Sequence, residues 1–348
     1  YGKLPATEGK KEIPALGFIA HMDTVSDFCD HEIRPMVTEN YDGGDLVLGT
    51  SGLVLSPKEF PHLTGLKGRT LLTSDGTTIL GADDKAGIAE ILTMIERIQT
   101  ENRPHGTICV AFTPDEEIGM GAEHFNLDQF GAEYAYTLDG DSEGEIQYEN
   151  FNACKAEFEI RGFNVHPGEG KDTMINASLV AIEINNCLPS METPRGTEDY
   201  EGFYHLISMQ GEVGEAKLNY IVRDHDKNGF EERKKTLRLI EKNLNAKWGE
   251  GTVTLKITDQ YLNMKEIVEE HMHLIDHAKK ACEAAGVAPL ILPIRGGTDG
   301  CQLSFKGLPC PNLGTGGHAF HGPYEHISVE GMEKSVELLL ALIQEYTK

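Results

Sequence analysis

The sequence has little positive charge and no long apolar run. It contains 31 Lys and Arg against 56 Asp and Glu, which gives a formal net charge of −25. A chain of this charge repels nucleic acids and anionic membrane surfaces. No stretch approaches the roughly 18 apolar residues of a transmembrane helix, and no signal peptide is visible. We therefore expect no nucleic acid and no membrane among the partners, and we interpret the acidity mainly as a source of solubility.

The sequence also lacks the closely spaced cysteine pairs of redox and zinc-ribbon sites. The number of cysteines is odd, no CxxC occurs, and several lie inside apolar runs: they are Cys29, Cys109, Cys154, Cys187, Cys282, Cys301 and Cys310. This pattern is typical of reduced thiols and predicts a cytoplasmic protein. The sequence starts at Tyr1 without Met, so its start says nothing about targeting.

The length favours two domains. A chain of 348 residues is too long for one ordinary core, and 39% hydrophobic with 25% charged residues is typical of globular proteins. Residues 1–150 alternate apolar runs, such as 15–20, 107–113 and 134–138, with a helical apolar pattern after residue 87. This alternation predicts an α/β domain, a mixed sheet covered by helices on both faces.

The pattern changes near Phe151. Strand patterns at about 151–160, 205–210, 216–222 and 253–257 surround helical patterns at 175–188 and 230–248. The order β-α-β-β-α-β is that of a ferredoxin-like α+β domain, predicted here over residues 151–261. Residues 262–348 return to helix and strand and contain His321. We expect residues 1–150 and 262–348 to form one discontinuous catalytic domain, with 151–261 inserted into it.

Imidazoles and carboxylates follow the apolar runs of the first domain. They are His21 with Asp23, Asp83 in GADDKAG, Glu116-Glu117 and Asp139, and His321 comes near the end of the chain. Two imidazoles with several carboxylates suit a borderline metal such as zinc. One carboxylate can bridge two cations, and a further one can serve as a general base. The pattern favours a two-metal hydrolase.

Each signal also has a plain structural alternative. His-x-Asp is often incidental, adjacent aspartates often cap a helix, and two glutamates on a turn are often simply solvated. His321 has a competitor in His318, three residues earlier. The signals gain weight together, because ligands bind at the carboxyl ends of strands in α/β sheets and His21, Glu117 and Asp139 all follow predicted strands.

The motifs resemble a known family. AHMDT (20–24), GADDKAG (81–87), TPDEEIG (113–119), TLDG (137–140), NVHPG (164–168), IRGGTDG (294–300) and FHGPYEH (320–326) are similar to those of the co-catalytic zinc metallopeptidases. This family includes glutamate carboxypeptidase and aminoacylase. GADDKAG and TPDEEIG mark the wider family, whereas IRGGTDG with LPCPNL (308–313) points to its peptidase T branch of tripeptide aminopeptidases. The similarity covers essentially the whole chain.

The resemblance implies roles for ten residues. Two zinc ions would be held by the metal ligands His21, Asp83, Glu117, Asp139 and His321, with Asp83 as the bridge. The catalytic residues would be Glu116 as general base, Asp23 as the partner of His21, and His166, which stabilises the oxyanion in a dimer partner's active site. Arg223 and Arg295 match substrate-binding arginines. The resemblance also implies a homodimer formed through the inserted domain.

These implications add up to an expected activity. We expect a dinuclear zinc aminopeptidase that releases the N-terminal residue of tripeptides by metal-activated water. Three extended residues span about 10–11 Å, so an arginine at that distance from the metals could select tripeptides by capturing the terminal carboxylate. The alternatives are a related zinc amidohydrolase, namely a carboxypeptidase or N-acyl amino acid deacylase, and a non-catalytic metal-dependent binding protein. The ligand types do not separate zinc from manganese or cobalt.

Overall fold

The computed structural model describes residues 1–348. The chain forms two compact units. The first comprises residues 1–148, 264–292 and 298–348, and the second comprises residues 149–263 and 293–297. The second unit thus includes 293–297, a stretch that we had assigned to the catalytic domain. It is tied there by backbone bonds from Ile294 N to Glu149 O and from Phe151 N to Gly296 O.

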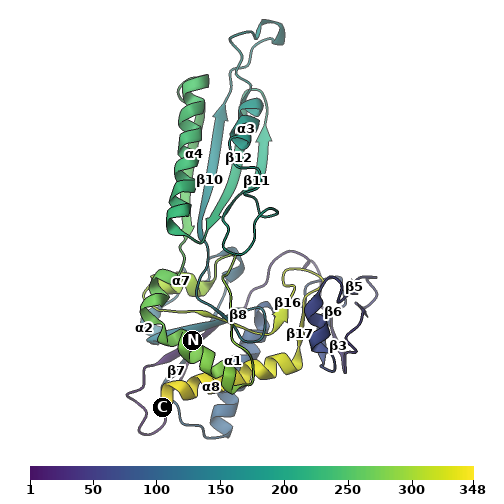
Figure 1. The fold of residues 1–348 in the computed structure, drawn as a ribbon, viewed down its shortest axis with the longest axis vertical. Coiled ribbons are helices and arrows are strands. Elements are labelled where there is room, and N and C mark those ends of the chain that lie inside the picture. The colour runs from purple at the N-terminus through teal and green to yellow at the C-terminus, as the bar shows by residue number, and fades with distance from the viewer. The chain divides into compact units, whose positions relative to one another are not determined.

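A seven-stranded mixed sheet organises the first unit (Figure 1). Its strands, in spatial order, are β1 (Gly2–Leu4), β7 (Ile108–Thr113), β2 (Leu16–His21), β8 (Tyr134–Gly140), β15 (Asn312–Gly314), β9 (Glu145–Gln147) and β14 (Leu290–Ile291). The pairs β7–β2, β2–β8, β8–β15 and β9–β14 are parallel, whereas β1–β7 and β15–β9 are antiparallel. The predicted mixed α/β sheet is confirmed.

Strand β2 is central because its apolar run is buried on both faces. Phe18 packs on Tyr136 of β8 toward one face, and Ile19 packs in a cluster with Phe130 and Leu303 on the other. The first face is covered by α1 (Ala82–Thr100), α6 (His273–Ala284) and α8 (Val329–Thr347), of which α1 and α8 lie side by side (Figure 1). The second face is covered by α2 (Leu127–Phe130) and α7 (Asp299–Phe305), with α5 (Lys265–Val268) against α7.

A smaller antiparallel sheet, which the sequence did not reveal, completes the first unit. Its order is β16 (Gly317–His318), β17 (His326–Ser328), β6 (Leu71–Ser74) and β3 (Pro35–Thr38). The loop between β16 and β17 carries His321. The remaining short elements of this unit are the hairpin β4 (Leu46–Val47) and β5 (Val54–Leu55), and the 3₁₀ turns η1 (Pro61–Leu66), η2 (Glu116–Ile118) and η4 (Glu269–His271).

The second unit has the predicted β-α-β-β-α-β order. Its elements are β10 (Asn152–Arg161), the 3₁₀ turn η3 (Pro167–Glu169), α3 (Ala177–Asn186), β11 (Phe203–Gly211), β12 (Glu215–Asp224), α4 (Lys227–Trp248) and β13 (Val253–Tyr261). The antiparallel sheet has the order β11-β12-β10-β13. Alternating side chains such as Phe158 and Leu218 pack against Val180 of α3 and Leu237 of α4. The ferredoxin-like fold is confirmed.

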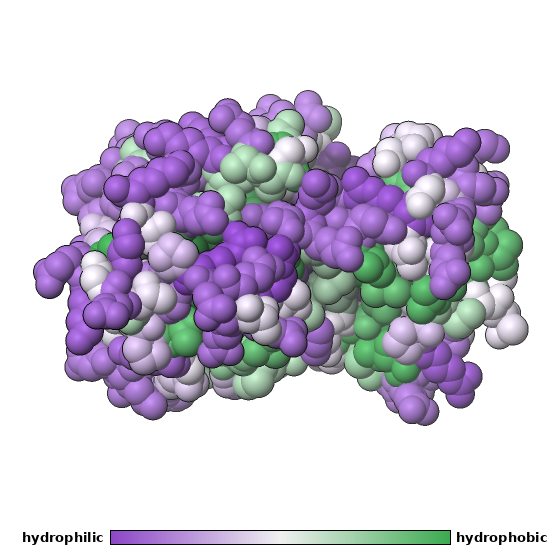
Figure 2. Space-filling model, turned by 90° about the horizontal axis from the view of Figure 1, so that it is seen from below, coloured by the Kyte–Doolittle hydropathy of each residue, from purple (hydrophilic) through white to green (hydrophobic).

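The surface and the cysteines agree with the composition. The face drawn in Figure 2 is mainly hydrophilic, with groups of apolar side chains between the polar ones. None of the helices is both long enough and apolar enough to cross a membrane. All seven cysteines are free thiols.

Candidate metal centre

The predicted site residues of the first unit gather at one edge of the large sheet. Strands β7, β2 and β8 are parallel neighbours, so their carboxyl ends meet there. His21 is the last residue of β2, and Asp139 lies near the end of β8. The turn with Glu116 and Glu117 follows β7, and Asp83 lies in the first turn of α1.

His21 is the centre of one group of donors. The imidazole is 2% exposed, and its Nε2 lies 2.8 Å from Asp83 Oδ1 and 3.4 Å from Asp139 Oδ1. Glu116 belongs to the same group, since one donor atom each of His21, Glu116 and Asp139 lie within 4.8 Å of one another. One donor atom each of His21, Asp83 and Glu117 also lie within 4.8 Å of one another.

His321 is the centre of a second group. Its Nε2 lies 2.9 Å from Asp83 Oδ2 and 3.2 Å from Glu117 Oε2. The two carboxylate oxygens of Asp83 therefore face one imidazole each, which is the arrangement of a carboxylate that bridges two cations. His318, the competitor of His321 in the sequence, is turned elsewhere. Its ring stacks on that of His62, with the centroids 3.9 Å apart.

The proton affinities also fit a cation site. Burial alone would lower the pKa of His21, but hydrogen bonds to Asp139 and Asp83 raise it to about 12. Hydrogen bonds with Asp83 and Glu117 raise the pKa of His321 to about 10. Burial, together with the charge of Asp139, raises the pKa of Glu116 to about 9. The two imidazoles thus hold protons that a divalent cation would displace. The nitrogen and oxygen donors of the site are those that zinc accepts.

Asp23 links His21 to the glutamate turn. Its Oδ1 lies 3.3 Å from His21 Nδ1. The same carboxylate accepts hydrogen bonds from the backbone N–H of Glu116 at 3.2 Å and from that of Glu117 at 3.1 Å. Such contacts orient metal ligands. The turn itself is shaped by Asp115 and Gly119, whose φ angles of 63° and 73° are left-handed.

Two further carboxylates, which were not predicted as site residues, hold the backbone of the site. Asp84, 1% exposed, accepts from the backbone N–H of His21 at 3.0 Å. Glu325, also 1% exposed, accepts from the backbone N–H of Leu80, Gly81 and Asp83 at 2.6–3.1 Å. Both residues lie inside the motifs GADDKAG and FHGPYEH, so the motifs were the available signal.

The other three predicted site residues belong to the second unit. His166 is exposed and caps η3, where its Nδ1 accepts from Gly168 N at 3.2 Å. Arg223 is 9% exposed and donates to the carbonyls of Cys154 and Val222.

Arg295 holds a loop of the second unit. Its guanidinium donates to the backbone carbonyls of Thr197, Asp199 and Glu201. It also lies over the rings of Phe151 and Phe203, 5.1 and 5.8 Å from their centroids. Both predicted substrate arginines are thus engaged with carbonyl groups of their own unit.

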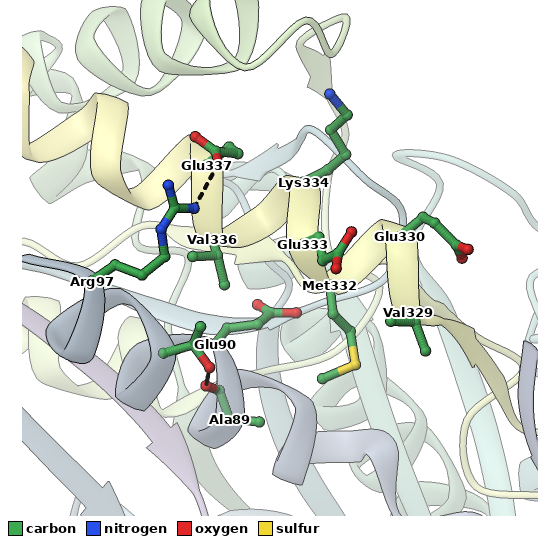
Figure 3. A pocket seen from close by; sticks show the side chains of 11 residues that line it. Ala89, Glu90, Arg97, Val329, Glu330, Met332, Glu333, Lys334, Val336 and Glu337 are labelled. Atoms are coloured by element: carbon green, nitrogen blue, oxygen red, sulfur yellow. Dashed lines mark hydrogen bonds and ion pairs between the residues drawn. The ribbon is translucent and has the colours of Figure 1, made fainter. Parts of the chain in front are cut away.

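A cavity of about 680 Å³ lies between α1 and α8 (Figure 3). It is lined by residues such as Glu90, Met332 and Val336, and an ion pair between Arg97 and Glu337 is part of its wall. None of its lining residues belongs to the predicted site.

The α/β sheet and the cluster of imidazoles and carboxylates at its edge define a metal-dependent hydrolase. The chain belongs to the peptidase family M20/M25/M40, whose model matches residues 76–345, and it is a metallopeptidase. The resemblance that we identified in the motifs is confirmed.

Individual relatives agree with this assignment. The chain is 52% identical over 342 residues to the Peptidase T of Caldanaerobacter subterraneus subsp. tengcongensis, covering 97% of this chain and 83% of that one. It is 55% identical over 350 residues to the Peptidase T of Desulfitobacterium hafniense (strain DSM 10664 / DCB-2), covering 100% and 85%. Among solved structures, the aminopeptidase PepT from Bacillus cereus ATCC 10987 is similar, with a TM-score of 0.80 and 26% identity over 99% of this chain and 84% of that one.

Proposed function

We propose that this metallopeptidase is a dinuclear zinc aminopeptidase that releases the N-terminal residue of tripeptides. The observation that carries the proposal is the position of Asp83, whose two oxygens lie 2.8 and 2.9 Å from His21 and His321. Relatives at 52–55% identity bear the name Peptidase T, and a similar solved structure is an aminopeptidase. In the proposed centre, His21, Asp83 and Asp139 would hold one ion, and Asp83, Glu117 and His321 would hold the other.

The chain's own residues then have distinct tasks. Zinc ions, when bound, supply a Lewis acid that polarises the scissile carbonyl and lowers the pKa of water. The Glu116 carboxylate accepts the proton of the attacking water and passes it to the leaving amine. Asp23 keeps the backbone of Glu116 and Glu117 in place through their N–H groups. In the proposed homodimer, His166 donates a hydrogen bond to the oxyanion in the partner's active site, and such a donor contributes about 10²–10³ in rate.

Selection of tripeptides is assigned to an arginine that captures the terminal carboxylate. Of the two candidates, Arg295 is the more accessible. Its side chain is partly exposed, whereas that of Arg223 is only 9% exposed. Binding a carboxylate would require Arg295 to exchange its carbonyl partners for the substrate. Equal cleavage of a tripeptide and its C-terminally amidated form would exclude this selection by length.

A homodimer through the inserted domain is part of the proposal. Strand β11 is an edge strand of its sheet, and such edges readily pair with another chain. Apolar side chains are exposed on it and on the neighbouring helix α3, namely Ile207 (56%), Met209 (39%), Leu179 (61%) and Ile182 (46%). A second copy that covers this surface would bury them. We keep the cytoplasm as the proposed location, given the seven free thiols.

The activity is tested with a panel of free di-, tri- and tetrapeptides, N-acyl amino acids and C-terminal carboxypeptidase substrates. The zinc-loaded protein should cleave tripeptides at the first peptide bond and the other substrates much more slowly. Preferential release of the C-terminal residue or of an acyl group would assign the site to a carboxypeptidase or a deacylase. If the protein binds metal but hydrolyses none of these substrates, the remaining alternative is a non-catalytic metal-dependent binding protein.

A further inference from the structure

Helix α7 contacts the segment that carries the glutamate turn, and it does so through side chains on one of its faces. Thr113 Oγ1 donates to Asp299 Oδ2 at 2.7 Å, at the end of β7. Gln302 Nε2 donates to Gly119 O at 3.0 Å, and Lys306 Nζ donates to Glu123 O at 2.8 Å. The spacing of three and four residues puts these side chains on the same side of the helix. The segment from residue 113 to 123 is therefore held by α7 before and after the turn.

Asp299 is the member of this face that is fully enclosed. It is 3% exposed, and its Oδ1 has no hydrogen-bond partner. The carboxylate also lies against Gly121, where an added Cβ would come within 2.3 Å of Asp299 Oδ1. A buried carboxylate with so few hydrogen bonds is costly, so its presence calls for a reason beyond packing.

The glutamate turn thus lies between two aspartates. Asp23 accepts from the backbone N–H of Glu116 and Glu117, and it also contacts His21. Asp299 contacts the strand residue just before the turn and the glycine just after it. Asp299 is therefore placed to hold the backbone of this segment on both sides of the turn.

We propose that Asp299 is a positioning residue for the hydrolysis. By binding the Thr113 hydroxyl and abutting Gly121, it keeps the carboxylate of Glu116 at the place where it meets the attacking water. This inference rests on the proposed function of Glu116 as the base. The alternative is that Asp299 serves stability alone, in which case its loss would change the melting temperature and leave turnover per folded, metal-loaded molecule unaltered.

The test compares Asp299→Ala, Asp299→Asn, Thr113→Val and Thr113→Ser in the metal-loaded protein. Ala and Val remove the hydrogen bond, whereas Asn and Ser retain an acceptor and a donor of similar size. We expect kcat on a tripeptide to fall about 10- to 100-fold in Asp299→Ala and Thr113→Val, with KM and metal content near those of the wild type. Asp299→Asn and Thr113→Ser should recover most of the loss.

Two further comparisons sharpen the result. The double variant Asp299→Ala/Thr113→Val should be no worse than either single variant, because both remove one shared contact. Asp128→Asn is the control, since Asp128 is an exposed aspartate in the first turn of α2, and its turnover should equal that of the wild type.

Unchanged kcat in Asp299→Ala would overturn the proposal. A fall in kcat that Asp299→Asn does not recover, or a fall in kcat that is explained by lost metal, would overturn it as well. Amide hydrogen exchange of residues 114–122 supplies a readout without substrate: it should be faster in Asp299→Ala than in Asp299→Asn. If the wild type cleaves no peptide, the proposed function fails, and the exchange comparison still decides whether Asp299 holds the turn.

Discussion

At the residue scale, the central proposal is a division of roles between two adjacent glutamates, Glu116 and Glu117. Both lie close to His21: Glu116 groups with His21 and Asp139, and Glu117 with His21 and Asp83. Only Glu117 also lies near His321, with 3.2 Å between Oε2 and Nε2. This contact favours Glu117 as the metal ligand that completes the second group. We therefore propose Glu116 as the group that transfers the proton.

Substitution of each glutamate by glutamine should separate the two roles. In Glu116→Gln, zinc content should persist while turnover of a tripeptide falls at least about 10²-fold, because the proton acceptor is gone. In Glu117→Gln, metal content should fall. Elemental analysis and kcat measure the two effects, and the exposed neighbour Asp115→Asn serves as control. Near-normal activity of Glu116→Gln would remove Glu116 from the mechanism, and unchanged metal content in Glu117→Gln would show that the roles are exchanged.

Glu90 is a residue whose burial works against stability. It is 1% exposed in the wall of the cavity between α1 and α8, and neither carboxylate oxygen has a hydrogen-bond partner. Burial raises the pKa of Glu90 well above its usual range. The unfolded chain therefore releases this proton at a lower pH than the folded protein does. The contribution of Glu90 is most favourable below about pH 4.5 and is lost as the pH rises toward the folded pKa.

Glu90→Leu should accordingly stabilise the protein, and more so at pH 8 than at pH 5. Removal of an unsatisfied buried polar group is worth about 1–3 kcal/mol. Thermal unfolding at the two pH values measures the gain, and Glu96→Leu is the control, because Glu96 is exposed on the same helix. A gain that does not grow with pH would show that Glu90 is not protonated in the folded protein.

How far the sequence predicts this site depends on what kind of contact a residue makes. His21, Asp83, Glu117 and His321 stand in motifs that resemble a known family, and the structure brings them together. Asp84, Glu325 and Asp299 also stand in such motifs, yet their partners are backbone N–H groups and a hydroxyl from distant segments. No pattern in the sequence says which amide a carboxylate will meet. The choice between His318 and His321 likewise depends on the loop between β16 and β17.

At the scale of elements, periodicity was a good guide to the long strands and helices. The predicted strand 216–222 is part of β12 (Glu215–Asp224), and the predicted helix 230–248 is part of α4 (Lys227–Trp248). The small sheet of β16, β17, β6 and β3 was missed because its strands have two to four residues, too few to show an alternation. That sheet nevertheless positions His321, because the loop between β16 and β17 carries this residue. The sheet that was not predicted is therefore one that the site needs.

The edge strand β11 provides a prediction at this scale. If the exposed apolar side chains of β11 and α3 form the dimer surface, Ile182→Lys/Ile207→Lys should convert a dimer into a monomer of 38.3 kDa. Light scattering measures the mass. Leu239→Lys is the control, because Leu239 on α4 is 56% exposed, as is Ile207, and lies outside this surface. A wild type that is already monomeric, or a variant that remains dimeric, would contradict the proposed surface.

At the scale of the whole molecule, the chain leaves the first unit after Tyr148 and returns to it at Met264. The cluster of candidate metal ligands consequently combines residues from segments before and after the second unit, since His21 precedes that unit and His321 follows it. The ferredoxin-like pattern and the position of His321 were the reasons for predicting an inserted domain over residues 151–261. The boundary residues were less predictable, because residues 293–297 join the second unit through backbone hydrogen bonds.

The account depends most on Asp83 joining two cation sites, and metal stoichiometry tests this directly. Protein saturated with zinc and then freed of excess metal should retain two ions per chain, and Asp83→Ala should lose at least one of them while remaining folded. Asp128→Asn should retain both. A single ion in the wild type, or two tightly bound ions in Asp83→Ala, would contradict a centre bridged by Asp83.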